Sequence, residues 1–223
     1  MQTDLNFLIS PLWISIKTAT VSTIIAFIIS IHAAYWRNMS KSKKLTFLDG
    51  LLILPLVLPP TLTGYLLLLI LGRYSFIGKL LSSIGVSVIF SWTSTVIAAF
   101  VVSFPIMYHT ARAAFILVDK NYIDEAKVCG LGNFHILWQV LLPLSFPSIA
   151  AGTVLAFARA LGEFGATLMI AGNIPGKTQT IPIALFFAVE SGEYSQAAIL
   201  AIVSMTISIA VLLLINRLMK NNL

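Results

Sequence analysis

Two side chains of opposite charge lie four residues apart in a long apolar stretch of the sequence. Arg159 and Glu163 would share one face of a helix, because residues at positions i and i+4 are neighbours on a helical surface. A charge at membrane depth is costly unless it has a partner. The pair would therefore either line a gate in a polar passage, or serve only to neutralise its own two charges. The sequence leaves both roles open.

A cluster of prolines and hydroxyl residues is the second feature with polar chemistry. Pro59 and Pro60 are followed by Thr61, Thr63 and Gly64. Proline removes backbone donors and bends a helix, which frees carbonyl groups and exposes hydroxyls along a polar path. We therefore expect these five residues to line a polar path or its gate. A kink needed only for packing is the alternative.

The segment from Gly172 to Thr178 reads G-N-I-P-G-K-T and looks like a phosphate-binding loop. Three residues separate its glycines where such a loop needs four, and no predicted strand precedes it. We interpret it as a turn shaped by Pro175 and Gly176. The chain itself is then expected to bind no nucleotide and no other cofactor.

Other site chemistries find no support in the sequence. The single Cys129 excludes a disulfide within the chain, and no cluster of His, Cys and carboxylates has the spacing of a metal site. The net charge is +6, but the basic residues are scattered without interleaved aromatics. We therefore expect membrane lipid as a partner, and neither a metal nor a nucleic acid.

The elements that carry these residues are predicted to be membrane helices. The chain is 58% hydrophobic and 10% charged, whereas a soluble domain carries about 25% charged residues. Five charge-free runs are long enough to span a bilayer; they lie between residues 17 and 37, 49 and 73, 79 and 112, 127 and 159, and 193 and 217. The fold class is an all-α integral membrane protein with about five transmembrane helices, forming one domain over residues 1–223.

Two segments qualify this count. The first run is expected to be a retained helix, since Asp4 and no Lys or Arg precedes Leu12. The apolar stretch 164–189 is the one place for a sixth span. Lys177 and several Gly and Pro residues divide it into pieces too short to cross a bilayer, so a re-entrant or interfacial segment is expected there.

Basic residues gather on one side of this topology, which marks the cytoplasmic side. On that side are Arg37, Lys41, Lys43, Lys44, Arg112, Lys120, Lys127, Arg217 and Lys220. The other side holds Arg73, Lys79 and Lys177. The N-terminus is therefore predicted outside and the C-terminus inside.

The longest cytoplasmic stretch, about residues 109–142, is dense in charge. Asp124, Glu125 and Ala126 suit a short amphipathic helix that Gly130 would end, and such a helix would dock onto a partner protein. An ordinary solvated loop with a surface helix is the alternative.

Here the sequence resembles the ABC importer permeases, whose cytoplasmic signature is Glu-Ala-Ala, three residues, Gly, and a Leu-Pro pair beginning twelve residues after that Gly. The matching positions are Asp124, Glu125, Ala126, Gly130, Leu142 and Pro143. Of the first three, Ala126 is identical, Asp124 keeps the carboxylate, and Glu125 replaces a small alanine. The resemblance assigns all six to the contact with an ATPase subunit, through a cytoplasmic coupling helix.

The resemblance narrows to the molybdate permease family along four segments. They are L-P-L-V-L-P-P-T-L-T-G-Y-L-L-L-L-I-L-G-R (54–73), V-V-S-F-P-I (101–106), L-P-L-S-F-P-S-I-A-A-G (142–152) and R-A-L-G-E-F-G-A-T-L-M-I-A-G-N-I-P-G-K-T-Q-T-I-P (159–182). Sulfate permeases share the R-A-x-G-E-F-G core, and the continuation G-N-I-P-G-K-T-Q-T-I-P favours molybdate.

The resemblance implies a transport subunit and not an enzyme. It implies a homodimer in the cytoplasmic (inner) membrane of a prokaryote, two cytoplasmic subunits that use ATP and Mg, and a substrate-binding protein outside. The chain would form the path for molybdate, and for tungstate as a close analogue. A sulfate or thiosulfate permease is the alternative, and an ion-gradient-driven secondary transporter is a distant one.

Overall fold

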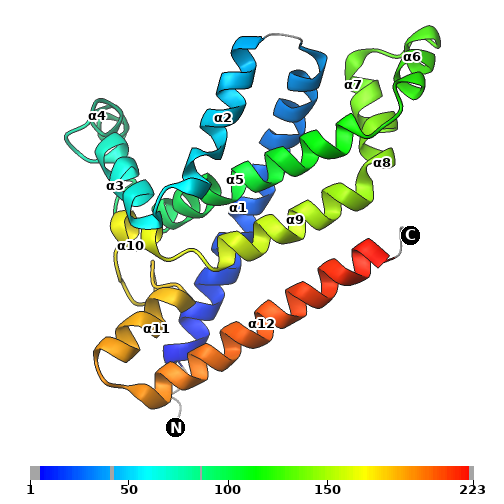
Figure 1. Cartoon of the computed structure of the whole chain (residues 1–223). Helices are drawn as coiled ribbons and strands as arrows, with labels where there is room; N and C mark the ends of the chain where they lie inside the picture. Colours follow the sequence, from blue (N-terminus) through cyan, green and yellow to red (C-terminus); the bar gives the residue numbers. More distant parts are fainter. Residues whose placement is uncertain (1–5, 41–42, 86, 221–223) are drawn as a thin grey trace.

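The computed structural model describes residues 6–40, 43–85 and 87–220, and over these ranges every regular element is a helix. In chain order they are α1 (Asn6–Met39), α2 (Lys43–Val57), α3 (Pro60–Leu71), α4 (Phe76–Ser83), α5 (Trp92–Ile116), α6 (Lys120–Val128), α7 (Asn133–His135), the π-helix η1 (Ile136–Leu141), α8 (Leu142–Leu144), α9 (Phe146–Leu161), α10 (Gly165–Ala171), α11 (Ile181–Glu190) and α12 (Tyr194–Lys220). Figure 1 shows α1 crossing beside α5 and α9, with α12 along the far side of α9.

The packing of α1 on α5 uses small and hydroxyl side chains. The hydroxyl oxygens of Thr18 and Thr95 lie 3.0 Å apart, and the Trp92 indole N–H donates to Thr18 over 3.0 Å. Small side chains let membrane helices approach closely, and hydrogen bonds between helices add to that packing. The buried members of this stripe on α1 recur every three or four residues and include Ser15, Thr18, Ala19, Ser22, Ala26, Ser30 and Ala34.

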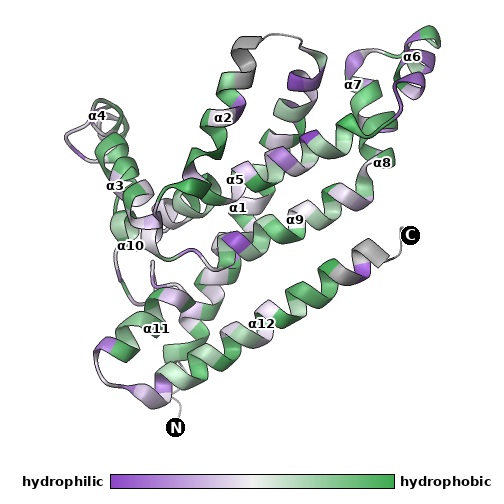
Figure 2. Ribbon diagram, in the orientation of Figure 1, coloured by the Kyte–Doolittle hydropathy of each residue, from purple (hydrophilic) through white to green (hydrophobic). Residues whose placement is uncertain are grey.

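The outer helix of the bundle is α12, which packs on α9 and α11. Ala197 and Leu200 are the buried side chains among its described residues. Figure 2 shows that the helix is hydrophobic along most of its length. An apolar helix with an exposed apolar surface is what a lipid-facing span requires.

The number of spans agrees with the sequence-based prediction. The helices α1, α5 and α12 are each long and apolar enough to cross a membrane, and the count rises from 3 to 5 if each of two bent helix pairs is one span. The all-α membrane fold is confirmed, and the predicted five spans equal the upper count. Within 164–189, α10 has 7 residues and α11 has 10, too few to cross a bilayer.

Three predicted runs have different boundaries in the structure. The second run is not one continuous helix, because α2 and α3 meet at an angle of 114°. Pro60 is the first residue of α3, where a backbone N–H has no acceptor within the helix. Proline therefore costs no hydrogen bond at this position. In the third run the long helix α5 begins only at Trp92, because residues 76–83 form the separate helix α4. The fourth becomes α9 only at Phe146, after an 83° bend from residues 133–144.

A buried carboxylate holds α2 against its neighbours. Asp49 is the only buried side chain among the residues of α2 whose burial is described. Its Oδ2 lies 2.9 Å from Arg37 Nε at the end of α1 and 2.9 Å from Arg112 Nη1 on α5. Its Oδ1 accepts a hydrogen bond of 2.5 Å from the Tyr108 hydroxyl, also on α5. One side chain therefore joins three helices.

Replacing Asp49 with Asn should destabilise the chain, because it leaves two partly buried arginines without their shared carboxylate. We expect a loss of about 2–3 kcal/mol, somewhat below that for a fully buried pair. The measurement is unfolding in detergent, followed through tryptophan fluorescence. The matched control is Asp124→Asn, which removes a 3.6 Å pair of exposed side chains and should change stability by less than about 0.5 kcal/mol. Equal stability of the two variants would contradict this account.

Candidate translocation gate and coupling segment

The pair predicted from sequence is an ion pair in the structure. Arg159 Nη1 lies 2.7 Å from Glu163 Oε2, at the end of α9. The Glu163 side chain is 2% exposed, whereas that of Arg159 is 29% exposed. The carboxylate is therefore buried in the protein, and the arginine side chain is partly exposed.

The second oxygen of Glu163 also has a partner. Glu163 Oε1 accepts a hydrogen bond of 2.9 Å from the backbone N–H of Ala166, in the first turn of α10. The first turn of a helix has N–H groups without helical acceptors, so a carboxylate placed there is stabilised. Glu163 thus fixes the start of α10 relative to the end of α9.

Glycines bring α10 into contact with α3. A Cβ atom at Gly64 would lie 2.7 Å from Cα of Ala166, and a Cβ at Gly165 would lie 2.9 Å from Cβ of Pro60. No larger residue fits at either position without a shift of backbone. We call the group formed by Pro60, Gly64, Arg159, Glu163 and Gly165 the α10 junction; Figure 1 shows α10 beside the start of α3.

The structure brings together part of the predicted path. Pro60, Gly64, Arg159 and Glu163 meet at the α10 junction. Thr63 is buried, and its hydroxyl donates to the Pro59 carbonyl over 3.4 Å, within its own turn. Pro59 and Thr61 have exposed side chains. Of the two threonine hydroxyls in this cluster, only that of Thr61 is therefore accessible.

The segment after α10 is a tight turn. The Ile174 carbonyl accepts N–H groups from Lys177, Thr178 and Gln179. The fully buried Thr178 hydroxyl accepts the Ile174 N–H over 3.1 Å and donates to the Gly172 carbonyl over 3.3 Å. These bonds form the turn around Pro175 and Gly176 that the sequence predicts.

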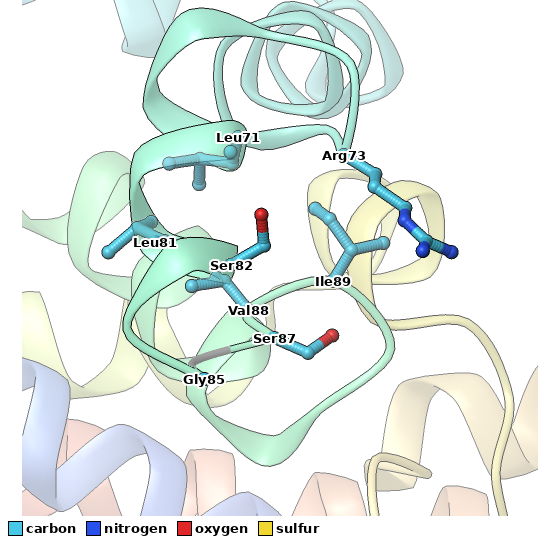
Figure 3. Close-up of a pocket in the computed structure, with 9 residues that line it drawn as sticks. Leu71, Arg73, Leu81, Ser82, Gly85, Ser87, Val88 and Ile89 are labelled. Atoms are coloured by element: carbon cyan, nitrogen blue, oxygen red, sulfur yellow. The ribbon is translucent and has the colours of Figure 1, made fainter.

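A cavity of about 330 Å³ lies elsewhere, between the end of α3, α4 and the segment leading to α5. It is lined by Leu71, Arg73, Gly78, Leu81, Ser82, Gly85, Ser87, Val88 and Ile89. Figure 3 shows the Arg73 guanidinium turned away from Leu71 and Leu81. None of the residues assigned to the path lines this cavity, so it is separate from the α10 junction.

The predicted coupling helix is α6. Asp119 caps its start by accepting the Asn121 N–H over 3.0 Å. At its end the Leu131 N–H bonds to the Ala126 carbonyl and the Gly130 N–H bonds to the Lys127 carbonyl. This is a Schellman ending, in which the residue at Gly130 must adopt a positive φ, here 81°. The sequence prediction that Gly130 ends the helix is confirmed.

The faces of α6 differ in burial. Ala126 is 7% exposed and packs in a core cluster with Phe115, Ile136 and Leu137. Asp124 and Glu125 are exposed, as is Pro143, whereas Leu142 is half-buried. Figure 2 shows α6 as one of the most hydrophilic helices, at the same end of the bundle as the C-terminus of α12.

Sequence reasoning missed the group around Asp49. It treated Asp49, Arg37 and Arg112 as markers of run boundaries, although they form one buried network. A signal was present, because a single carboxylate at the edge of an apolar run calls for a partner. Which arginine would supply that partner depends on helix packing, and spacing along the chain does not give it.

The chain matches known transport proteins over most of its length. The family described as "Binding-protein-dependent transport system inner membrane component" matches residues 24–221. The chain is 42% identical over 189 residues to the putative molybdenum transport system permease protein YvgM of Bacillus subtilis, covering 84% of this chain and 83% of that protein. It is 40% identical over 213 residues to the molybdenum transport system permease protein ModB of Escherichia coli K12, covering 93% of each.

Solved structures share the fold. A bacterial ABC transporter that imports alginate matches with a TM-score of 0.75 at 15% identity, over 97% of this chain and 80% of that one. The inward-facing MetNI methionine ABC transporter matches with a TM-score of 0.72 at 12% identity, over 99% and 98%. From the family match and the two relatives together, the chain belongs to the inner membrane components of binding-protein-dependent transport systems.

Proposed function

We propose that this chain is the permease subunit of an ATP-driven molybdate importer. The observation that carries the proposal is the identity of 42% and 40% to two molybdenum permeases over 84% and 93% of the chain. The α10 junction supports it, because the R-A-L-G-E-F-G-A-T segment supplies a buried, fixed ion pair next to a helix break. Tungstate is accepted as a close tetrahedral analogue, and a sulfate or thiosulfate permease is the alternative.

The permease works as a homodimer with two ATP-binding subunits and an extracytoplasmic substrate-binding protein. The partner subunits bind and hydrolyse ATP with Mg, and the chain itself is not an enzyme. The chain is one transmembrane domain whose coupling loop is expected at about residues 109–142; α5 continues through Ile116, so the part of this loop outside the long helix begins at Leu117.

The N-terminus lies on the outer side of the cytoplasmic membrane, and the C-terminus lies on the cytoplasmic side. Figure 1 supports this orientation, because α6 and the end of α12 lie at one end of the bundle and the start of α1 lies at the other. The charged helix α6 must then face the compartment that holds ATP. Closure of the ATPase dimer would move α6 and favour one of two arrangements of the spans.

Arg159 is suited to pass an anion without trapping it. Its bond to Glu163 uses a donor on Nη1, and the side chain is 29% exposed, so other guanidinium donors can serve an anion. The carboxylate also balances the positive charge, so an oxyanion meets hydrogen-bond donors with a reduced net attraction. Conduction needs binding that is favourable enough to enter and weak enough to leave.

An ion-gradient mechanism has less support. It needs a carboxylate or His in the membrane that is free to take up a proton or sodium ion. Glu163 was the one candidate in the sequence, and both its oxygens are engaged, by Arg159 and by the Ala166 N–H.

Uptake tests the proposed function. In cells that lack their own permease, this chain with its ATPase and binding protein should restore ATP-dependent accumulation of radiolabelled molybdate. Unlabelled tungstate should compete strongly and sulfate weakly. No uptake above the empty-vector level would overturn the proposal, and competition by sulfate alone would favour the sulfate permease.

Paired substitutions separate the two roles of Arg159 and Glu163. The double variant Arg159→Gln, Glu163→Gln keeps an uncharged hydrogen-bonded pair and the cap on Ala166. If Arg159 serves the path, uptake should fall by about tenfold or more, because a charge-assisted bond to the anion is lost, while melting in detergent stays near wild type. The single variant Arg159→Gln is the control, since it leaves a buried carboxylate unpaired and should melt earlier. Wild-type uptake by the double variant would show that the pair only neutralises itself.

A further inference from the structure

A buried serine marks the joint between the coupling segment and α9. Ser145 is 4% exposed and is the single residue between α8 and α9. At this residue the chain bends by 83°. Its hydroxyl donates over 3.3 Å to the carbonyl of Ala114, in the last turn of α5. Carbonyls in the last turn of a helix have no helical donor, so this hydroxyl satisfies an otherwise unpaired group.

Several hydroxyl groups of α5, unlike that of Ser145, form local hydrogen bonds. Ser94 and Ser103 on α5 donate to carbonyls three residues earlier, and Thr110 donates to one four residues earlier. Such local bonds leave the packing between helices unchanged. The Ser145 bond instead joins residues 31 positions apart and ties the start of α9 to the end of α5.

The chain between these two points is one packed unit. Ala126 of α6, Ile136 and Leu141 of η1, and Phe115 of α5 belong to the same buried cluster. The Schellman ending at Gly130 fixes α6 to the segment that follows it. Residues 117–144 therefore form a closed loop that leaves α5 and enters α9 at the same joint. A movement of α6 is transmitted to both helices at this joint.

Further along α9, Gly152 lies against Thr110 of α5, but side chains leave space beside the joint itself. A cavity of about 350 Å³ lies beside it, lined by Ala114, Leu117, Val118, Asp119, Tyr122, Leu144, Ser145 and Ser148. This space leaves room for the first turn of α9 to shift relative to the loop. The hydrogen bond to Ala114 is then the polar contact that holds the two helix ends together.

We propose that Ser145 is the positioning residue of energy coupling, which makes α5 and α9 move together when the ATPase moves α6. This inference rests on the proposed function. Without the hydroxyl, α6 would still receive the movement, but the first turn of α9 would follow the end of α5 less closely. ATP would be hydrolysed with less transport.

The test compares Ser145→Ala with Ser148→Ala in the complete complex, reconstituted in vesicles with ATPase and binding protein. Ser148 is exposed, lies one turn further along α9, and lines the same cavity. For Ser145→Ala we expect about fivefold fewer molybdate ions imported per ATP hydrolysed, with stimulation of ATP hydrolysis by the binding protein retained. Ser148→Ala should match wild type, and Ser145→Thr, which keeps the hydroxyl, should restore the ratio.

A distance measurement reports on the joint itself. Spin labels on the native Cys129, at the end of α6, and on Leu155→Cys, an exposed position of α9, would follow the angle between the two. Ser145→Ala should broaden this distance distribution, and Ser148→Ala should not.

An unchanged transport ratio or an unchanged distribution in Ser145→Ala would overturn the inference, as would failure of that variant to insert, which would mark a purely structural role. If the wild-type complex itself imports no molybdate, the proposed function has failed instead.

Discussion

The constraint on which this structure depends is that a charge buried in a membrane protein must have a partner. Water is absent from the bilayer core, so an unpaired carboxylate would be strongly destabilising. Asp49 and Glu163 both meet this requirement with arginines and with a further donor each, Tyr108 and the Ala166 N–H. Each pairing also fixes helices: Asp49 joins α1, α2 and α5, and Glu163 joins α9 to α10.

Small residues provide the remaining packing contacts between helices. Lipid is as apolar as the helices, so the hydrophobic effect contributes little to their association. Gly64 and Gly165 let α3 and α10 touch, and Gly152 lets α9 approach Thr110 on α5. Hydroxyls such as Thr18 and Thr95 then bond where the backbones are close. The α10 junction and the joint at Ser145 therefore sit on opposite ends of α9, so a movement at one end is carried to the other by a single helix.

The sequence predicts the features that are local. Apolar runs of span length predict the all-helical membrane fold, and the spacing of Ala126 and Gly130 predicts α6, whose ending depends only on residues within one turn. The bend between α2 and α3 is predicted only in part. The paired prolines indicate a kink, but they do not give its angle of 114°. The start of α5 at Trp92 was missed because apolar residues of α4 extend the third run.

Contacts between distant segments are beyond the spacing rules. Arg159 and Glu163 were predicted as a pair because they are one turn apart, whereas Asp49 and Arg112 meet only after α2 packs on α5. The contact of Gly64 with Ala166 and the bond from Ser145 to Ala114 are of the same kind. A glycine or serine in a membrane helix has many uses, so its partner becomes visible only in the packed fold.

The central claim is that the charged segment carrying α6 faces the cytosol, where a motor subunit can engage it. Cys129 tests this directly, since it is the single cysteine of the chain and is exposed beside that segment. A membrane-impermeant maleimide should label it in inverted vesicles stripped of peripheral subunits, and should leave it unmodified in intact spheroplasts. Labelling of Cys129 from the external medium of intact spheroplasts would contradict the account.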